Sequence, residues 1–309
     1  MEEKQLFGIV NDIQTMCIND GPGYRTMVFL KGCNLNCEWC HNPEGKRRYP
    51  EVIPFMNNCI ACKECVDVCP TGALKLGNDD KPSVDPCLCT SCLQCVDYCE
   101  HGGLIKWGNI MSLEEVKHEI LEDKMLFEHS GGGLTISGGE PMCQPEFACA
   151  LMKAIKEEEG KVNTALDTCG HAPWEEYEKI LQYTDLVLFD IKNMNTKAHR
   201  EYAGLGNEII LENARRIALS GVKMRIRIPV IPGRNDSQEN WEKTAEFIKE
   251  LGDAVLGVDL LPYHPHAGGK YKAFGLDYPF IADDAVNDES LIPVVEFFMD
   301  HAPEVTVGG

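Results

Sequence analysis

The sequence of 309 residues has no hydrophobic run that approaches the roughly 20 apolar residues needed to span a membrane. Its first residues, MEEKQLFGIV, lack the basic start and apolar core of a signal peptide. Basic residues are also few: 29 lysines and arginines stand against 49 aspartates and glutamates, and a net charge of −20 argues against binding nucleic acid phosphates. We therefore expect a cytoplasmic protein that binds neither a membrane nor a nucleic acid.

Cysteine, in contrast, is abundant. The chain contains 16 cysteines, too few for a disulfide scaffold but many for a cytoplasmic protein. Many are spaced C-x2-C, which suits metal binding rather than disulfide bonds in a reducing compartment. No cysteine follows Cys169. These features indicate a metalloprotein from an oxygen-poor setting.

The segment KGCNLNCEWCHNPEG places Cys33, Cys37 and Cys40 in a C-x3-C-x2-C run, here called the three-cysteine loop. Three thiolates can hold three irons of a 4Fe–4S cluster, whereas an electron-transfer cluster normally has four. The fourth iron is then free to bind a substrate, a pattern typical of radical S-adenosylmethionine (SAM) enzymes. Zinc is the alternative, but zinc prefers paired C-x2-4-C units and four ligands.

Strand-like runs alternate with helical patterns along most of the chain, and a capping box of Ser112 and Glu115 opens one helix. The predicted strands are 26–33, 134–139, 163–170, 186–192, 223–230 and 254–264. This alternation predicts an α/β fold with parallel strands. Six units are too few for an eight-stranded barrel, so we expect an open (β/α)6 partial barrel with its site at the carboxyl ends of the strands.

Residues 56–107 interrupt this alternation and hold nine of the cysteines. They contain two C-x2-C-x2-C-x3-C runs, the pattern of bacterial ferredoxins with two 4Fe–4S clusters, in which the fourth cysteine of each run binds the other cluster. The predicted ligands are Cys59, Cys62, Cys65 and Cys99 for the first set, and Cys89, Cys92, Cys95 and Cys69 for the second set. Two zinc knuckles are the alternative. The predicted domains are thus 1–55, the ferredoxin-like insert 56–107, and 108–309.

The order of motifs resembles that of glycyl radical enzyme activating enzymes of the radical SAM superfamily. The chain is similar to the pyruvate formate-lyase activating enzyme, with the ferredoxin-type insert added. The motifs that carry the resemblance are DGPGYRT, the three-cysteine loop, TISGGEP, LDTCG, DIK, RIRIPVIPG and LLPYH. They cover most of the chain in the order of the family.

The resemblance implies a role for each matching residue. Those expected to contact SAM are Trp39, His41, Gly138, Gly139, Glu140, Lys192 and His264. Those expected to hold a monovalent cation, Na⁺ or K⁺, against the SAM carboxylate are Asp167, Thr168 and Asp190. Candidates to grip a peptide loop of the partner are Asp20, Arg25 and Arg227. Without the resemblance, both strand-end aspartates could be helix N-caps and His264 a packed loop residue.

The implied activity is reductive cleavage of SAM to methionine and a 5′-deoxyadenosyl radical, which abstracts a Cα hydrogen from a glycine of a partner glycyl radical enzyme. The implied cofactors are three 4Fe–4S clusters, one binding SAM and two auxiliary. We expect a monomer that receives electrons from a flavodoxin or ferredoxin. The alternatives are a radical SAM peptide-modifying maturase and, in another class, a low-potential electron-transfer protein. The auxiliary clusters could relay electrons or stabilise the insert, and the sequence leaves the partner's identity open.

Overall fold

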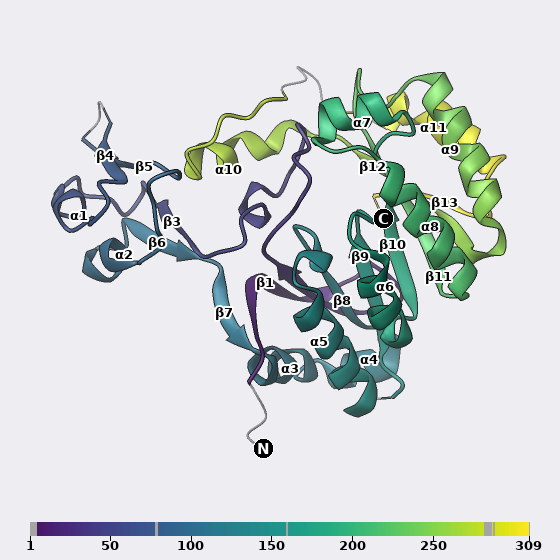
Figure 1. Ribbon diagram of the computed structural model, residues 1–309, viewed down its shortest axis with the longest axis horizontal. Helices are drawn as coiled ribbons and strands as arrows, with labels where there is room; N and C mark the ends of the chain where they lie inside the picture. The colour runs from purple at the N-terminus through teal and green to yellow at the C-terminus, as the bar shows by residue number, and fades with distance from the viewer. Residues whose placement is uncertain (1–4, 78–79, 159, 281–285, 287, 309) are drawn as a thin grey trace.

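The computed structural model describes residues 5–77, 80–158, 160–280, 286 and 288–308. Six neighbouring strands form its parallel centre (Figure 1): β2 (Arg25–Leu30), β8 (Gly133–Gly138), β9 (Asn163–Thr168), β10 (Leu186–Asp190), β11 (Lys223–Val230) and β12 (Val255–Pro262). They lie in chain order across the sheet, as right-handed crossovers between adjacent parallel strands require. The six predicted strands are confirmed, and the arrangement is consistent with an open partial barrel.

Three further strands, which the sequence analysis missed, extend this sheet to nine strands. β1 (Phe7–Cys17) pairs antiparallel with β2 and with β7 (Asn109–Ser112), and β13 (Val305–Val307) pairs parallel with β12. The sheet is therefore mixed. Several predicted strands also end too late: β9 stops at Thr168 and β10 at Asp190, because the chain there leaves the sheet and turns into loops.

Helices connect the parallel strands and cover the sheet. They are α3 (Leu113–Leu121), α4 (Lys124–Ser130), α5 (Pro145–Glu158), α6 (Trp174–Ile180), α7 (Thr196–Ala203), α8 (Glu208–Ser220), α9 (Gln238–Leu251), α10 (Gly268–Ala273) and α11 (Asp288–Met299). The capping box is confirmed, since Glu115 N donates to Ser112 Oγ and Ser112 N donates to Glu115 Oε2. None of the described helices is long and apolar enough to cross a membrane.

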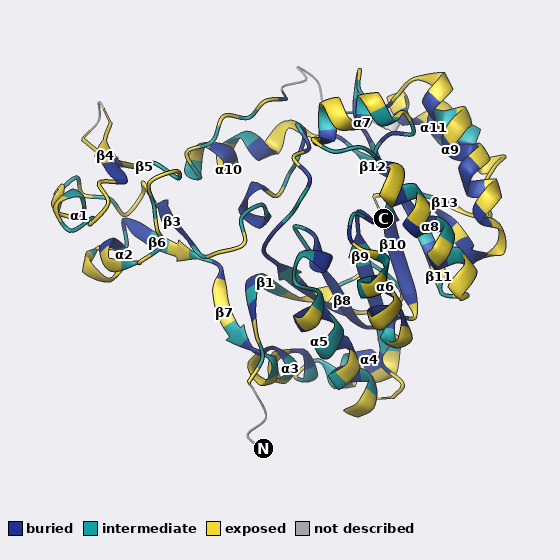
Figure 2. Ribbon diagram, in the orientation of Figure 1, coloured by how far each residue is buried: buried dark blue, intermediate teal, exposed yellow. Residues whose placement is uncertain are grey.

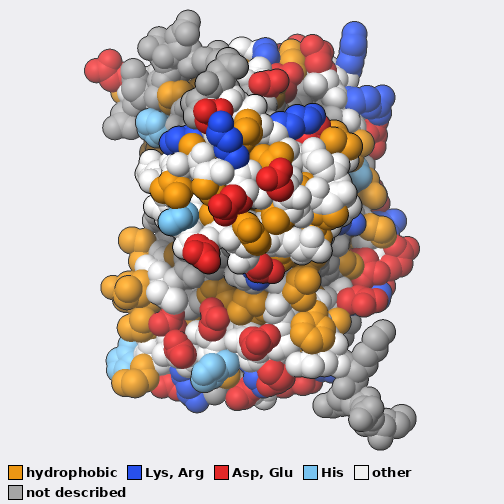
Figure 3. Space-filling model, turned by 90° about the vertical axis from the view of Figure 1, so that its left-hand side faces the viewer, with side chains coloured by type: hydrophobic (Ala, Val, Ile, Leu, Met, Phe, Trp, Pro, Cys, Tyr) orange, Lys and Arg blue, Asp and Glu red, His pale blue; other side chains and the backbone are white. Residues whose placement is uncertain are grey.

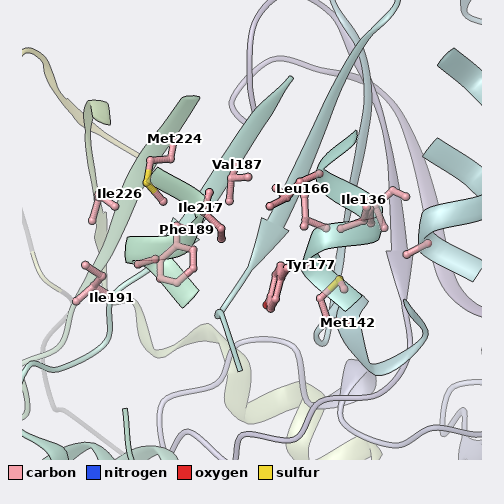
Figure 4. Close-up of a cluster of buried hydrophobic side chains, with 14 of the residues drawn as sticks. Ile136, Met142, Leu166, Tyr177, Val187, Phe189, Ile191, Ile217, Met224 and Ile226 are labelled. Carbon is pink, nitrogen blue, oxygen red and sulfur yellow. The ribbon is translucent and has the colours of Figure 1, made fainter. Parts of the chain in front are cut away.

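The core lies between the sheet and its helices. Figure 2 shows buried residues along the strands and exposed residues on the outer faces of the helices. In Figure 4, Ile136, Leu166, Val187 and Phe189 project from three strands, β8, β9 and β10, toward helix residues such as Ile217, and all five residues are fully buried. Burying one such side chain contributes about 1.5–3 kcal/mol. This packing holds the strand ends, and hence the residues that follow them, in fixed positions.

The insert lies beside the barrel, on the left of Figure 1. It consists of β3 (Glu51–Pro54), α1 (Glu64–Asp67), β4 (Leu74–Leu76), β5 (Pro82–Val84), α2 (Gln94–Tyr98) and β6 (Leu104–Trp107). β3 pairs with β6, and β4 pairs with β5. Along the chain, each half of the insert consists of a strand, a cysteine-bearing loop, a short helix and a second strand. The small sheet starts at Glu51, which places the beginning of the insert ahead of the predicted residue 56.

Candidate active site

A cavity of about 550 Å³ lies at the carboxyl ends of the parallel strands. It brings together most of the residues predicted for the site. Those that line it are Asp20, Cys33, Cys37, Trp39, Cys40, His41, Gly138, Gly139, Asp167, Thr168, Asp190, Lys192 and Arg227. They come from the ends of β8, β9 and β10, from β11, and from the loops that follow β1 and β2. Glu140, His264 and Arg25 are absent from the lining, for reasons given below.

The three-cysteine loop is fixed to the body of the protein by backbone hydrogen bonds. Cys33 N donates to Lys46 O at 3.0 Å, and Asn36 N donates to Ala203 O at 2.8 Å. The loop is packed in an apolar cluster, and this burial raises the pKa of Cys37 to about 11. Deprotonating these thiols therefore requires a compensating positive charge, which bound iron supplies.

Each thiol of the loop faces the same cavity, and this donor set fits an iron–sulfur cluster. Among the described residues, no three or more His, Cys, Asp or Glu side chains are gathered closely enough to bind a single metal ion. A cube takes one thiolate per iron, so its ligands stand further apart than those around one zinc ion. Burial raises the pKa of Cys37 and Cys40, and the positive charge of Lys46, which also lines the cavity, partly opposes that rise. Lys46 was not among the predicted site residues, although it directly follows the NPEG segment.

Gly138 and Gly139 line the cavity, and neighbouring backbone atoms of the protein leave no room for a side chain at either position. A Cβ on Gly139 would stand 2.3 Å from Gly32 O and 2.4 Å from Gly45 O. Gly138 has a φ of +124°, and a Cβ there would stand 2.2 Å from Leu30 O. The end of β8 therefore packs directly on the backbone that flanks the three-cysteine loop.

Glu140 lies beneath the cavity and is fully buried. Its carboxylate accepts hydrogen bonds from Thr168 Oγ1 and Cys169 N, each at 2.7 Å, and from Met142 N at 3.0 Å. Burial raises the pKa of this carboxyl in spite of these bonds. In this structure both carboxylate oxygens accept hydrogen bonds from the chain itself, and the contact between Glu140 and the SAM amino group stays a prediction.

Charged side chains pair across the floor of the cavity. Arg227 Nη2 donates to Asp20 Oδ1 at 2.8 Å, and its Nη1 lies 3.4 Å from Asp167 Oδ2. Lys192 Nζ donates to Asp190 Oδ2 at 2.7 Å. Burial raises the pKa of Asp167 to about 6, Arg227 opposes this rise, and Asp190 adds to it. Neither strand-end aspartate acts as a helix cap here; both are bound to basic side chains.

His41 and His264 lie together at one side of the cavity. Their rings stack with centroids 4.0 Å apart, so His264 supports His41 from behind. Burial, followed by the effect of His264, lowers the pKa of His41 to about 4. Its Nε2 is buried without a hydrogen-bond partner within the described part of the chain. A neutral imidazole with a free nitrogen suits an uncharged polar ligand such as adenine.

Arg25 does not reach the cavity. It is fully buried at the start of β2, where its guanidinium donates to Thr135 Oγ1 at 2.5 Å, Pro22 O at 2.9 Å and Asn163 Oδ1 at 3.1 Å. A partner loop could contact it only by displacing these bonds. In this structure Arg25 ties β2 to its neighbours, and its contact with the partner stays a prediction.

Comparison with known proteins identifies the family. The profile described as "Radical SAM superfamily" matches residues 91–248, and "4Fe-4S binding domain" matches 52–75. The chain is 41% identical over 276 residues to the (2S)-3-sulfopropanediol dehydratase activating enzyme of Klebsiella oxytoca, covering 88% of this chain and 86% of that one. The chain belongs to the glycyl radical enzyme activating enzymes of the radical SAM superfamily. This activating enzyme thus cleaves SAM reductively and generates a glycyl radical on a partner enzyme.

Two further comparisons agree. The chain is 38% identical over 283 residues to the isethionate sulfite-lyase activating enzyme of Nitratidesulfovibrio vulgaris, covering 90% of this chain and 91% of that one. Streptococcus suis SuiB bound to its precursor peptide SuiA has a TM-score of 0.54 at 14% identity, covering 90% of this chain and 46% of that one. This last similarity concerns the fold alone.

Part of the cavity lining in this activating enzyme is apolar and exposed, a feature that was not predicted, and it is called the rim here. The residues after the middle of β1, among them Met16 and Ile18, line the cavity. Met16 is 64% exposed and Ile18 is 65% exposed. Two large apolar side chains in front of DGPG, in an otherwise polar stretch, are the signal that could have revealed this rim.

In the insert, the cysteines form two separate groups, each lining its own cavity. One cavity is lined by Cys59, Cys62, Cys65 and Cys99. The other is lined by Cys69, Cys89, Cys92 and Cys95. Burial and the three neighbouring thiols raise the pKa of Cys65 in the first group and raise that of Cys95 to about 11 in the second. Cys87 is exposed and lines neither of these two cavities.

Proposed function

We propose that this activating enzyme binds SAM in the 550 Å³ cavity, on a 4Fe–4S cluster held by the three-cysteine loop. The observation that carries the proposal is the convergence of three buried thiols and the strand-end residues on one cavity. When bound, the cluster supplies the electron that breaks the sulfonium bond of SAM. The apolar wall around the loop excludes water from the reacting atoms, which protects a radical reaction.

The charged pairs of the cavity floor suit the methionyl end of SAM. Lys192, which is largely buried, can turn toward a carboxylate, and Asp190 can then accept an ammonium group or hold a monovalent cation beside it. His41, held neutral against His264, suits the adenine, and Trp39 packs beside it in the same buried wall. Glu140 acts as a positioning residue, since it ties the loop after β9 to the end of β8.

The partner's glycine loop would approach over the exposed rim of Met16 and Ile18. These two side chains are largely exposed, whereas Arg227 is buried and the Asp20 side chain is largely buried. The rim offers apolar surface for the loop, and the Asp20–Arg227 pair offers polar contacts to its backbone. The partner is a glycyl radical enzyme, as for the two relatives above, whose names refer to a dehydratase and a sulfite-lyase.

Two auxiliary clusters in the insert complete the cofactors, with the first set and the second set as their ligands. The support is that each cavity draws its cysteines from both ferredoxin-type runs, as the crossed pattern requires. The insert then forms a domain of its own between the two parts of the barrel. A flavodoxin or ferredoxin would supply its electrons.

Iron counting with Mössbauer spectroscopy on anaerobically reconstituted protein tests this proposal. Three 4Fe–4S clusters predict about twelve irons per chain. Cys37→Ala should leave about eight irons, because it removes one ligand of the cluster held by the three-cysteine loop. About four irons in the unchanged protein would contradict the two auxiliary clusters. About twelve irons in the Cys37→Ala variant would contradict the assignment of the three-cysteine loop.

A further inference from the structure

The second set lies on the side of the insert that faces the barrel. Val52 of β3 lines its cavity, and the adjacent Glu51 accepts a hydrogen bond from Lys31 Nζ at 2.9 Å. Lys31 is only two residues from Cys33 of the three-cysteine loop. One ion pair therefore separates the backbone that lines the second cavity from the backbone that carries the SAM site.

Two other strands of the insert also indicate that the second set lies on the side that faces the barrel. On β5, Pro82 lines the first cavity and Val84 lines the second. Val84 O lies close to Gly275 of the barrel, where a Cβ would stand 3.1 Å from it. β6 ends at Trp107, whose ring meets Phe274 edge-on with centroids 6.2 Å apart. The first set thus lies further from the barrel than the second set.

This orientation is held by a buried joint. Lys31 is fully buried, and its Nζ also donates to Glu44 O at 2.5 Å. Arg47 adds a second cation 3.3 Å from Glu51. Turning the insert would leave buried charges unpaired, which is strongly unfavourable. The joint therefore keeps the second set on the side of the insert that faces the barrel.

The outer end of the insert is open to solvent around the first set. Cys62 is exposed, and two large apolar side chains flank it in the lining of the first cavity, Ile60 at 60% exposure and Tyr98 at 51%. Figure 3, viewed from the side of the insert, shows hydrophobic side chains among acidic and basic ones on this face. A small apolar patch around a redox centre suits the transient docking of a carrier protein, because weak redox interfaces are small.

We propose that a small electron-carrier protein docks on the Ile60–Tyr98 patch and delivers electrons to the first set, from which they pass through the second set to the three-cysteine loop. Each transfer would move one electron from the carrier, which is oxidised, to SAM as the final acceptor, and the cysteines of the first set, the second set and the three-cysteine loop would hold the clusters that accept and pass on this electron. This proposal rests on the clusters assigned under Proposed function, and it adds the order of transfer and the docking surface.

The test compares Ile60→Glu with the control Leu219→Glu, a change at an 86% exposed leucine on α8 away from the insert. Photoreduced flavodoxin serves as the carrier, and freeze-quench electron paramagnetic resonance follows cluster reduction. We expect Ile60→Glu to slow reduction by flavodoxin at least about tenfold, while SAM cleavage driven by dithionite stays unchanged. Leu219→Glu should alter neither rate. Equal reduction rates in the two variants would overturn the docking surface.

Two further variants test the order. With Cys89→Ala/Cys92→Ala, flavodoxin should still reduce the first-set cluster, but the electron should not reach the cluster of the three-cysteine loop. With Cys59→Ala/Cys62→Ala, flavodoxin should reduce none of the remaining clusters at the normal rate. If the cluster of the three-cysteine loop is reduced at the normal rate in either variant, the proposed order of electron transfer is refuted. If the unchanged protein does not cleave SAM with dithionite as the reductant, that result would instead contradict the proposed function.

Discussion

Replacing Gly139 by alanine should damage the SAM site without changing any of the cysteines or the predicted cation ligands. The added Cβ would meet Gly32 O at 2.3 Å and Gly45 O at 2.4 Å, whereas ordinary contacts begin at 3.4 Å. Both atoms belong to backbone, so the end of β8 or the flank of the three-cysteine loop must shift by about 1 Å. Overpacking of this kind costs about 1–3 kcal/mol. When this free-energy cost falls on SAM binding, the affinity for SAM decreases by about 5- to 150-fold.

Anaerobic calorimetry of SAM binding to the reconstituted Gly139→Ala variant measures this loss. Gly269→Ala is the matched control, because Gly269 has no atom within 4 Å of its Cβ position and no positive φ. Iron content should stay near that of the unchanged protein in the control. If Gly139→Ala binds SAM as tightly as Gly269→Ala, the close contact between β8 and the loop does not shape the site.

Three other changes test separate parts of the site. Cys37→Ala should abolish 5′-deoxyadenosine formation while the insert clusters assemble, because it removes a direct ligand; retained product would reject the assignment. Asp190→Ala should weaken SAM binding and remove any difference between Na⁺ and K⁺ buffers, since it frees Lys192 and deletes a hard oxygen ligand; an unchanged cation response would exclude a cation role. Met16→Asp should raise the KM for the partner at least about tenfold with normal uncoupled SAM cleavage, as a charge disrupts an apolar contact; a normal KM would remove Met16 from the docking rim.

The cysteine spacings and strand patterns predicted most of the architecture. Cys33, Cys37 and Cys40 meet in one cavity because a short loop leaves them little freedom. Strands buried on both faces form apolar runs, so the six parallel strands were visible in the sequence. β1 and β13 were missed for opposite reasons: β1 carries polar and exposed residues along half its length, and β13 is only three residues long.

What the sequence could not show at the site has a common physical cause. Glu140 and Arg25 make hydrogen bonds within the chain that the sequence did not reveal. Gly138 and Gly139 line the cavity as expected, and they also pack on neighbouring backbone. Sequence shows that a charged residue follows a strand, yet it does not show which donors already surround it. Arg227 was the more predictable case, because an arginine inside a strand requires an anionic partner.

Electron paramagnetic resonance of the partner tests the central claim most directly. The reconstituted protein, SAM and a reductant are incubated with a candidate partner glycyl radical enzyme, and with its variant in which alanine replaces the radical-bearing glycine. We predict a stable glycyl radical signal whose splitting changes when the glycine Cα carries deuterium, with the label recovered in 5′-deoxyadenosine. The Cys37→Ala protein should give no signal. A signal of equal size from Cys37→Ala, or from the alanine partner, would contradict the account.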